Sequence, residues 1–200
     1  MVIAWDAAVW RRSWKWKFLL LFTFCHSPQG PPIRGSTSAA PARFAGAAQV
    51  AVTDVVERPL AVAKAVGADR CVRADQLSGG AGSLAEVVGE VDVAFEVSGS
   101  PAAVATCLAT VARGGRIVQV GTLPAEGLQF PANQVMAREI DYVGTFRFGV
   151  EFDWSVQYLT ERRVDVQPLL TAQFPLQESE AAFRLAADKS RSVKVQLVAT

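Results

Sequence analysis

Apolar residues form short runs that alternate with helical patterns from about residue 45 to the C-terminus. Segment 91–97 is a continuous apolar run of strand length, broken only by Asp92 and Glu96, which is typical of a strand buried on both faces of a parallel sheet. Segment 49–54 and the glycine-bounded segment 114–121 are further strand candidates. Further strands are predicted at 71–72, 140–148 and 192–198, and helices at 57–69, 83–90, 101–111, 151–161 and 177–188. This alternation predicts an α/β chain with a doubly wound parallel sheet and a C-terminal helix–strand extension.

The first 44 residues differ in composition from the rest. They hold four of the five tryptophans and six of the 20 Lys and Arg residues, but only one of the 19 acids, Asp6. The stretch "RRSWKWK" before "FLLLFTFC" resembles a signal peptide, although an apolar run of about eight residues is too short to span a bilayer. Export and a peripheral membrane contact are the alternatives to a foreign, irregular leader, which the composition favours.

The predicted organisation is therefore a leader at 1–44, a partial cofactor-binding domain at 45–150 and a C-terminal segment at 151–200. A net charge of +1 gives no case for nucleic acid as a partner. The cysteines Cys25, Cys71 and Cys107 are scattered and form no CxxC pair, which fits a reducing compartment and a cytoplasmic location without stable membrane insertion. Cys25 and the single histidine, His26, supply too few ligands for a structural zinc site.

Small and polar residues follow the predicted strands. Asp54 ends the strand at 49–54, Ser98 and Gly99 follow the strand at 91–97, and Gly121 and Thr122 follow the next. Phe146 and Arg147 end the strand that begins at residue 140. Ligands of doubly wound sheets bind beyond the carboxyl ends of the strands, so these ends are expected to share one crevice. Asp54 then has two interpretations, which are a helix cap and a carboxylate that accepts hydrogen bonds from an adenosine ribose and repels a 2′-phosphate.

A Rossmann unit needs G-x-G-x-x-G about 20 residues before such an acid. The segment ahead of Asp54 contains Gly30 and Gly35 but no such motif. The letters Gly80-Ala81-Gly82-Ser83-Leu84-Ala85 fit G-x-G-x-x-A, but they follow a polar stretch rather than an apolar strand, and they are interpreted as a surface loop. The predicted fold class is therefore an incomplete Rossmann-like sheet that lacks its first strand and phosphate loop, with an irregular N-terminal leader.

From about residue 42 onward the chain resembles the cofactor-binding and C-terminal portion of zinc-type medium-chain dehydrogenases, in the branch of sorbitol and L-idonate 5-dehydrogenases. The segments that carry the resemblance are "ARFAGAAQVAVTDVVERPLAVAKAVGAD", "VDVAFEVSGSPAAV", "GGRIVQVGT", "REIDYVGTFRF" and the tail from "VDVQPLL" to "VKVQLV". Together they cover about 155 of the 200 residues, in the order the family has them.

The resemblance implies an NAD-dependent oxidoreductase that acts on a small polyol or sugar acid by hydride transfer. Asp54 would bind the adenosine ribose, Ser98 and Gly99 would pack along the cofactor, and Val120, Gly121 and Thr122 would lie near the nicotinamide amide. Phe146 and Arg147 would close over the cofactor, and Arg147 and Phe148 would reach the substrate. The family's subunits join edge to edge, which implies a homo-oligomer.

The resemblance also shows what is missing. The family's zinc ligands and proton-relay residues belong to an N-terminal domain that this sequence lacks, so no catalytic or metal-binding residue is assigned. A truncated or frame-shifted origin, with a leader of about 40 residues, would account for the loss of this domain and for that of the first strand and phosphate loop. The alternative is a non-catalytic fragment that acts only as a dimerisation or interaction partner.

Overall fold

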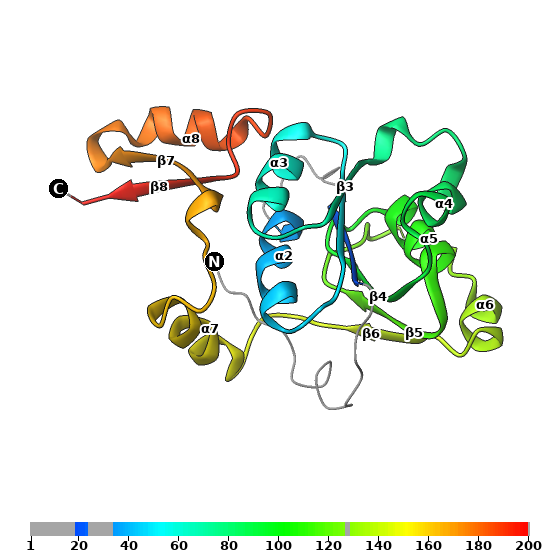
Figure 1. Ribbon diagram of the computed structural model, residues 1–200. Coiled ribbons are helices and arrows are strands. Elements are labelled where there is room, and N and C mark those ends of the chain that lie inside the picture. The colour runs from blue at the N-terminus through cyan, green and yellow to red at the C-terminus, as the bar shows by residue number, and fades with distance from the viewer. Residues whose placement is uncertain (1–18, 24–33, 127–128, 200) are drawn as a thin grey trace.

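The computed structural model describes residues 19–23, 34–126 and 129–199, and its main element is a six-stranded parallel sheet. Figure 1 shows this sheet with helices on both faces. In spatial order, its strands are β3 (Arg70–Arg73), β2 (Val50–Asp54), β1 (Leu19–Thr23), β4 (Val91–Glu96), β5 (Val111–Gln119) and β6 (Asp141–Gly144). The predicted α/β fold with a doubly wound parallel sheet is confirmed, and this strand order is that of a Rossmann fold.

The two faces of the sheet are covered by different helices. Helices α2 (Arg34–Phe44) and α3 (Glu57–Ala65) pack with Val50, Val52 and Phe95 on one face. Helices α4 (Ser83–Val88) and α5 (Pro101–Thr110) pack with Ala51 and Ala94 on the other. Successive residues of a strand point to opposite faces, and both faces of β2 and β4 are buried, which explains why most residues at 50–54 and 91–96 are apolar.

Strand β1 corrects one sequence-based expectation. Leu19–Thr23 lies between β2 and β4, and it pairs in parallel with both. The sheet therefore has a strand in the position of the first Rossmann strand, and the expectation that this strand is missing is wrong. The expected loss of the phosphate loop concerns residues 24–33, which lie outside the described residues.

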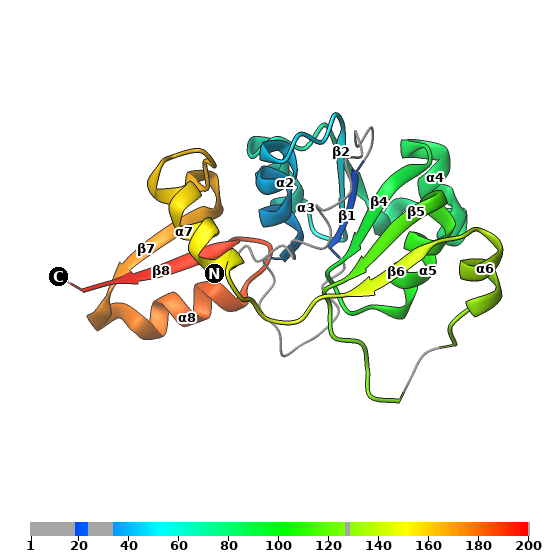
Figure 2. The ribbon, with the colours of Figure 1, turned by 90° about the horizontal axis from the view of Figure 1, so that it is seen from below.

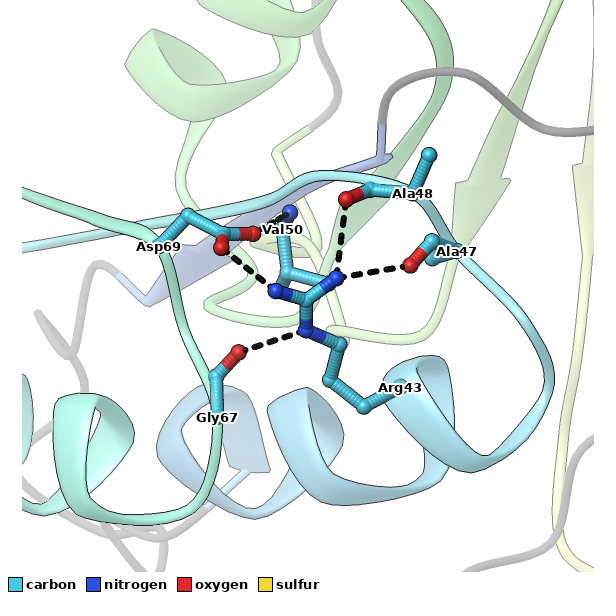
Figure 3. Close-up of polar contacts among 6 residues, drawn as sticks. All are labelled: Arg43, Ala47, Ala48, Val50, Gly67 and Asp69. Atoms are coloured by element: carbon cyan, nitrogen blue, oxygen red, sulfur yellow. Dashed lines mark hydrogen bonds and ion pairs between the residues drawn. The ribbon is translucent and has the colours of Figure 1, made fainter.

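Helix α2 also lies within the segment predicted to be a leader, and an arginine attaches it to the sheet. Arg43 donates to the backbone oxygens of Ala47, Ala48 and Gly67, at 2.9, 2.8 and 3.0 Å, and forms an ion pair with Asp69 (Figure 3). The Asp69 carboxylate also accepts the backbone N–H of Val50 at 2.7 Å. One side chain thus fixes the end of α2 to the entry of β2 and to the segment before β3.

A second, two-stranded parallel sheet is formed by β7 (Leu170–Pro175) and β8 (Lys194–Val198), next to helix α8 (Ser179–Ala187). Figure 2 shows this unit beside the six-stranded sheet. Val62 of α3 packs with Leu169 and Val193, which joins the two parts. The remaining elements are α6 (Ala132–Ala137), α7 (Glu151–Thr160) and the 3-10 turns η1 (Ala74–Gln76), η2 (Gly80–Gly82), η3 (Gln167–Leu169) and η4 (Leu176–Glu178).

Candidate functional site

The carboxyl ends of all six strands lie at one edge of the large sheet, because every pair of neighbouring strands is parallel. Asp54 of β2 is paired with Thr23 of β1. One row further back, Phe22, Glu96 and Gln119 follow one another across β1, β4 and β5. Since neighbouring strands lie about 4.8 Å apart, the ends of β2 and β4 are separated by about 10 Å. The predicted convergence of these strand ends is therefore present.

Asp54 lies at the end of β2 and is almost completely buried, with 1% of its surface exposed. Its Oδ1 atom accepts the backbone N–H of Val56 at 2.9 Å. Val56 is the N-cap residue of α3 and makes no side-chain cap, so Asp54 shapes the turn that leads into the helix rather than capping it directly. A ribose can reach this carboxylate only if the residues that cover it move.

The turns after β4 and β5 meet backbone to backbone. Gly99 has a φ of +74°, and a Cβ atom added to it would lie 2.9 Å from the carbonyl carbon of Thr122. A Cβ atom on Gly121 would lie 2.8 Å from the Cα atom of Gly99. Larger residues cannot occupy either position without a backbone shift. The predicted site residues Gly99, Gly121 and Thr122 therefore form one compact backbone surface at the ends of β4 and β5, which we call the floor of the candidate site.

A fully buried carboxylate supports this floor. Glu96 is 0% exposed and accepts the backbone N–H groups of Ser98, at 2.8 Å, and of Gly99, at 2.9 Å. The Ser98 hydroxyl and the Gln119 side-chain amide also donate to it. The Glu96 backbone oxygen accepts the N–H groups of Val120 and Gly121 at 2.7 and 3.0 Å. Glu96 thus binds both turns.

The network continues to β6. The Gln119 amide also donates to the backbone oxygen of Gly121 at 2.7 Å, and its Oε1 atom accepts the Tyr142 hydroxyl at 2.6 Å. Burial raises the pKa of Tyr142 to about 12, with smaller contributions from Cys107 and Glu96. The sequence analysis assigned no role to Gln119 or Tyr142. The signal for Gln119 is a polar residue at the carboxyl end of an apolar strand segment, whereas Tyr142 lies near the start of the partly exposed strand β6 and gives no such signal.

The residues after β6 lie on the surface. Phe146 is 82% exposed and Phe148 is 57% exposed. Arg147 has a φ of +64°, and its guanidinium carbon lies 5.0 Å from the centre of the Phe146 ring. The backbone N–H of Thr145 donates to the backbone oxygen of Gln119 at 3.0 Å, which fixes the start of this segment to the carboxyl end of β5. The predicted closure of Phe146 and Arg147 over a ligand therefore stays a prediction.

Gly80 and Gly82, which match G-x-G-x-x-A by letters, are exposed, as expected of a surface loop. Gly80–Gly82 forms the short turn η2, and a Cβ atom on Gly80 or Gly82 would meet nothing within 4 Å. No backbone segment approaches these glycines as closely as the turns at Gly99 and Gly121 approach each other.

The described residues offer no zinc site. Within 19–23, 34–126 and 129–199, no group of three or more His, Cys, Asp or Glu side chains could hold a metal ion. Burial raises the pKa of the Cys71 thiol, and it raises that of the Cys107 thiol well above its usual range. Both thiols are free, as expected. Cys25 and His26 lie outside the described residues.

Within the described residues, no helix is long and apolar enough to cross a membrane.

The fold and the strand-end floor define a dinucleotide-binding type of α/β protein. The profile of the family described as "Zinc-binding dehydrogenase" matches residues 35–161. The chain belongs to this family, which confirms the resemblance found in the sequence. The match begins at residue 35, so most of α2 is included in it.

Individual relatives agree with this assignment. The chain is 39% identical to the L-idonate 5-dehydrogenase (NAD(P)(+)) of Escherichia coli K12 over 153 residues, and 33% identical to the sorbitol dehydrogenase of Arabidopsis thaliana over 162 residues. These alignments cover 76% and 77% of this chain but only 44% of each relative. The solved structure of the E. coli L-idonate 5-dehydrogenase superposes with a TM-score of 0.73 and 32% identity, over 92% of this chain and 50% of that one. The chain thus spans about half the length of the relatives that it matches.

Proposed function

We propose that this chain is the cofactor-binding portion of an NAD-dependent dehydrogenase of polyols or sugar acids, of the sorbitol or L-idonate type. The observation that carries this proposal is the convergence of Asp54, the Ser98–Gly99 turn and the Gly121–Thr122 turn at one edge of a parallel sheet. In doubly wound sheets a dinucleotide lies across this edge. Its two ends would then contact β2 on one side and β4 and β5 on the other.

Each predicted site residue has a proposed role in this arrangement. Asp54 accepts hydrogen bonds from the adenosine ribose and repels a 2′-phosphate, which favours NAD over NADP. Ser98 and Gly99 pack along the cofactor, and Val120, Gly121 and Thr122 present their backbone to the nicotinamide amide. Phe146 and Arg147 close over the cofactor, and Arg147 and Phe148 contact the substrate. The exposed ring contact between Phe148 and Phe152, with Phe146 exposed nearby in the sequence, supports this last role, because neighbouring exposed apolar side chains can mark a binding surface.

The residues fit the cofactor only in part. The small residues at 98–99 and 121–122 let the two turns meet backbone to backbone and present no bulky side chain there, whereas the coverage of Asp54 opposes ribose binding. The sequence between β1 and α2 also lacks the glycine pattern that binds a pyrophosphate. Each charge-assisted hydrogen bond that is lost costs about 1.5–3 kcal/mol, so NAD is expected to bind weakly, with a Kd above about 100 μM.

The described residues do not fit zinc, so no catalytic step is assigned to them. In zinc-dependent dehydrogenases the metal polarises the alcohol oxygen before hydride transfer to the cofactor. We therefore expect this chain alone to bind the dinucleotide without oxidising a polyol. We also assign it to the cytoplasm, because Cys71 and Cys107 are free thiols, as is usual in a reducing compartment.

A second candidate function is that of a non-catalytic dimerisation partner. The observation that favours it is the position of β6, which pairs with β5 alone among the described strands. Phe146, Phe148 and Phe152, which follow this strand, are exposed. An open strand edge beside apolar side chains can pair with a second subunit. Light scattering after size-exclusion chromatography tests this, since a monomer at about 100 μM would rule out a stable dimer.

Calorimetric titration of NAD and NADP, with wild type and Asp54→Ala compared, tests the cofactor proposal. Wild type is expected to prefer NAD, and Asp54→Ala to lose at least tenfold in affinity for NAD. Asp153→Ala is the control, because it removes an exposed carboxylate from α7. Equal affinities of NAD for wild type and Asp54→Ala would contradict the proposed role of Asp54.

A further inference from the structure

We propose that Glu96 is a positioning residue of the crevice, and that its buried negative charge favours the oxidised, cationic nicotinamide over the reduced, neutral one. This inference rests on the proposed function, because it assumes that a nicotinamide dinucleotide binds at the strand ends. It adds a role for a residue that lies under the binding floor and lines no part of its surface. It also makes a statement about redox state, which the proposed function does not.

The surroundings of Glu96 consist of hydrogen-bond donors. Its Oε1 atom accepts from the Ser98 N–H, the Ser98 hydroxyl and the Gly99 N–H, and its Oε2 atom accepts from the Gly99 N–H at 3.1 Å and from the Gln119 amide. Two backbone N–H groups and an amide N–H₂ group can only donate. A carboxylate, which only accepts, satisfies all of them, so this arrangement is built around the ionised form.

The same contacts explain why Glu96 fixes the geometry of the floor. Ser98 and Gly99 belong to the turn after β4, whereas Gln119 belongs to β5 and also holds the Gly121 backbone oxygen. The carboxylate therefore lies between the two turns and binds both. Its Oε2 atom would be 2.7 Å from a Cβ atom on Gly121, so it lies directly beside the Gly99–Gly121 contact.

The charge of Glu96 is not matched by an ion pair. None of the salt bridges between described residues includes this side chain, and all of its described partners are neutral. A charge in a low-dielectric interior acts over a longer range than one in water. The floor formed by Gly99 and Gly121 is thus placed over a fixed negative charge.

Two carboxylates lie near the carboxyl ends of the strands, one on β2 and one on β4. Asp54 at the end of β2 is proposed to bind the ribose of the adenosine, and Glu96 lies about two strand spacings away, or about 10 Å. A dinucleotide that extends from Asp54 toward β4 and β5 brings its nicotinamide ring near Glu96. The ring carries a positive charge in NAD⁺ and none in NADH, so only the oxidised form gains from this attraction. At a separation of about 8 Å and an effective dielectric constant of about 20, this attraction corresponds to a preference of about three- to tenfold after screening.

The test measures the Kd values of NAD⁺ and NADH for wild type, Glu96→Gln, Glu96→Asp and Tyr142→Phe. Glu96→Gln removes the charge at nearly constant volume, and the ratio of Kd(NADH) to Kd(NAD⁺) is expected to fall about three- to tenfold. Glu96→Asp keeps the charge but shortens the side chain, so both affinities should weaken while the ratio stays within twofold of wild type. Tyr142→Phe removes one hydrogen bond to Gln119 without a change of charge, and its ratio should equal that of wild type.

The outcomes separate the inference from the proposed function. An unchanged ratio in Glu96→Gln contradicts the redox preference. If Glu96→Gln does not fold, a ratio in Glu96→Asp that differs from wild type by more than twofold contradicts it, and wild-type affinities in Glu96→Asp contradict the positioning role. If wild type binds neither NAD⁺ nor NADH, the proposed function and the redox preference fail together. Amide hydrogen exchange then decides the positioning role on its own, because the Ser98 and Gly99 amides should exchange at least tenfold faster in Glu96→Asp than in wild type, and equal rates would refute it.

Discussion

Gly121 and Gly99 meet so closely that a Cβ atom on Gly121 would lie 2.8 Å from the Cα atom of Gly99. This contact joins the ends of β4 and β5 into one surface, with Glu96 beside it. The part of the candidate site at the ends of β4 and β5 is therefore made of backbone, and the side chains of Glu96 and Gln119 hold that backbone in place.

Gly121→Ala should destabilise the fold and weaken NAD binding, because the added methyl group overlaps backbone atoms that cannot rotate away. Overpacking of this kind costs about 1–3 kcal/mol, or about 2–10 °C in Tm for a chain of this size. Calorimetry and cofactor titration measure the two effects. Gly144→Ala is the matched control, because a Cβ atom there meets nothing within 4 Å. Equal melting temperatures for the two variants would contradict the close contact.

Leu21→Pro should prevent folding, because the proline removes an N–H group from the middle of β1. Leu21 is paired with Val52 on one side and with Phe95 on the other, so the loss affects the centre of the sheet. Circular dichroism and limited proteolysis report the result. Leu21→Val, which keeps the N–H group, serves as the control and should fold. A cooperative melt of Leu21→Pro at the wild-type temperature would mean that the leader contributes no central strand.

Arg43→Met should lower the free energy of unfolding by about 1–3 kcal/mol, because it removes the donor of three backbone oxygens and the cationic partner of Asp69, which keeps only the Val50 N–H. Urea denaturation measures this change. Arg184→Met removes an arginine from an ion pair whose partners are 78% and 79% exposed, and such pairs contribute little. If the two variants lose the same stability, the attachment of α2 by Arg43 is unimportant.

Stability should fall between about pH 10 and pH 12 because of Tyr142. The phenol in the folded protein has a pKa of about 12, against about 10 in the unfolded chain, so the folded state holds this proton more tightly. The contribution is complete below pH 10 and is lost as the pH rises toward 12. Because the side chain is about half-buried, we expect a loss of about 1–2 kcal/mol rather than the full value. Urea denaturation at pH 9 and pH 11.5 should show a smaller loss for Tyr142→Phe, and equal losses would contradict the assignment.

The sequence predicted the parts of the fold in which local pattern and burial agree. The apolar runs at 49–54 and 91–97 correspond to β2 and β4 within one residue at each end, because parallel strands are apolar on both faces. Strand β1 was missed because a short apolar run after basic residues also resembles an export signal. Helix α2 was missed because it contains Pro41 and several small residues, and its buried residues Ala39 and Ala42 stabilise it through packing. Strand β7 follows Pro168 closely and ends at Pro175, which conceals it.

The candidate site was predictable in outline only. The positions of Asp54, Gly99 and Gly121 follow from the rule that strand ends share one edge. The contact between Gly99 and Gly121, and the bonds from Glu96 to Gln119 and from Gln119 to Tyr142, depend on the register between neighbouring strands. The sequence pattern shows where each strand lies along the chain, but it does not show which residues of two neighbouring strands stand opposite each other. The division of the chain at residues 44 and 150 stays a prediction.

The central claim is that one dinucleotide contacts the ends of β2, β4 and β5 together. Titration of NAD⁺ into the ¹⁵N-labelled protein, followed by the amide signals of Asp54, Ser98, Gly99, Gly121 and Thr122, tests it most directly. The account predicts that all five signals shift with one common Kd. Shifts confined to residues away from these strand ends, or shifts at 98–99 and 121–122 with none at Asp54, would contradict it.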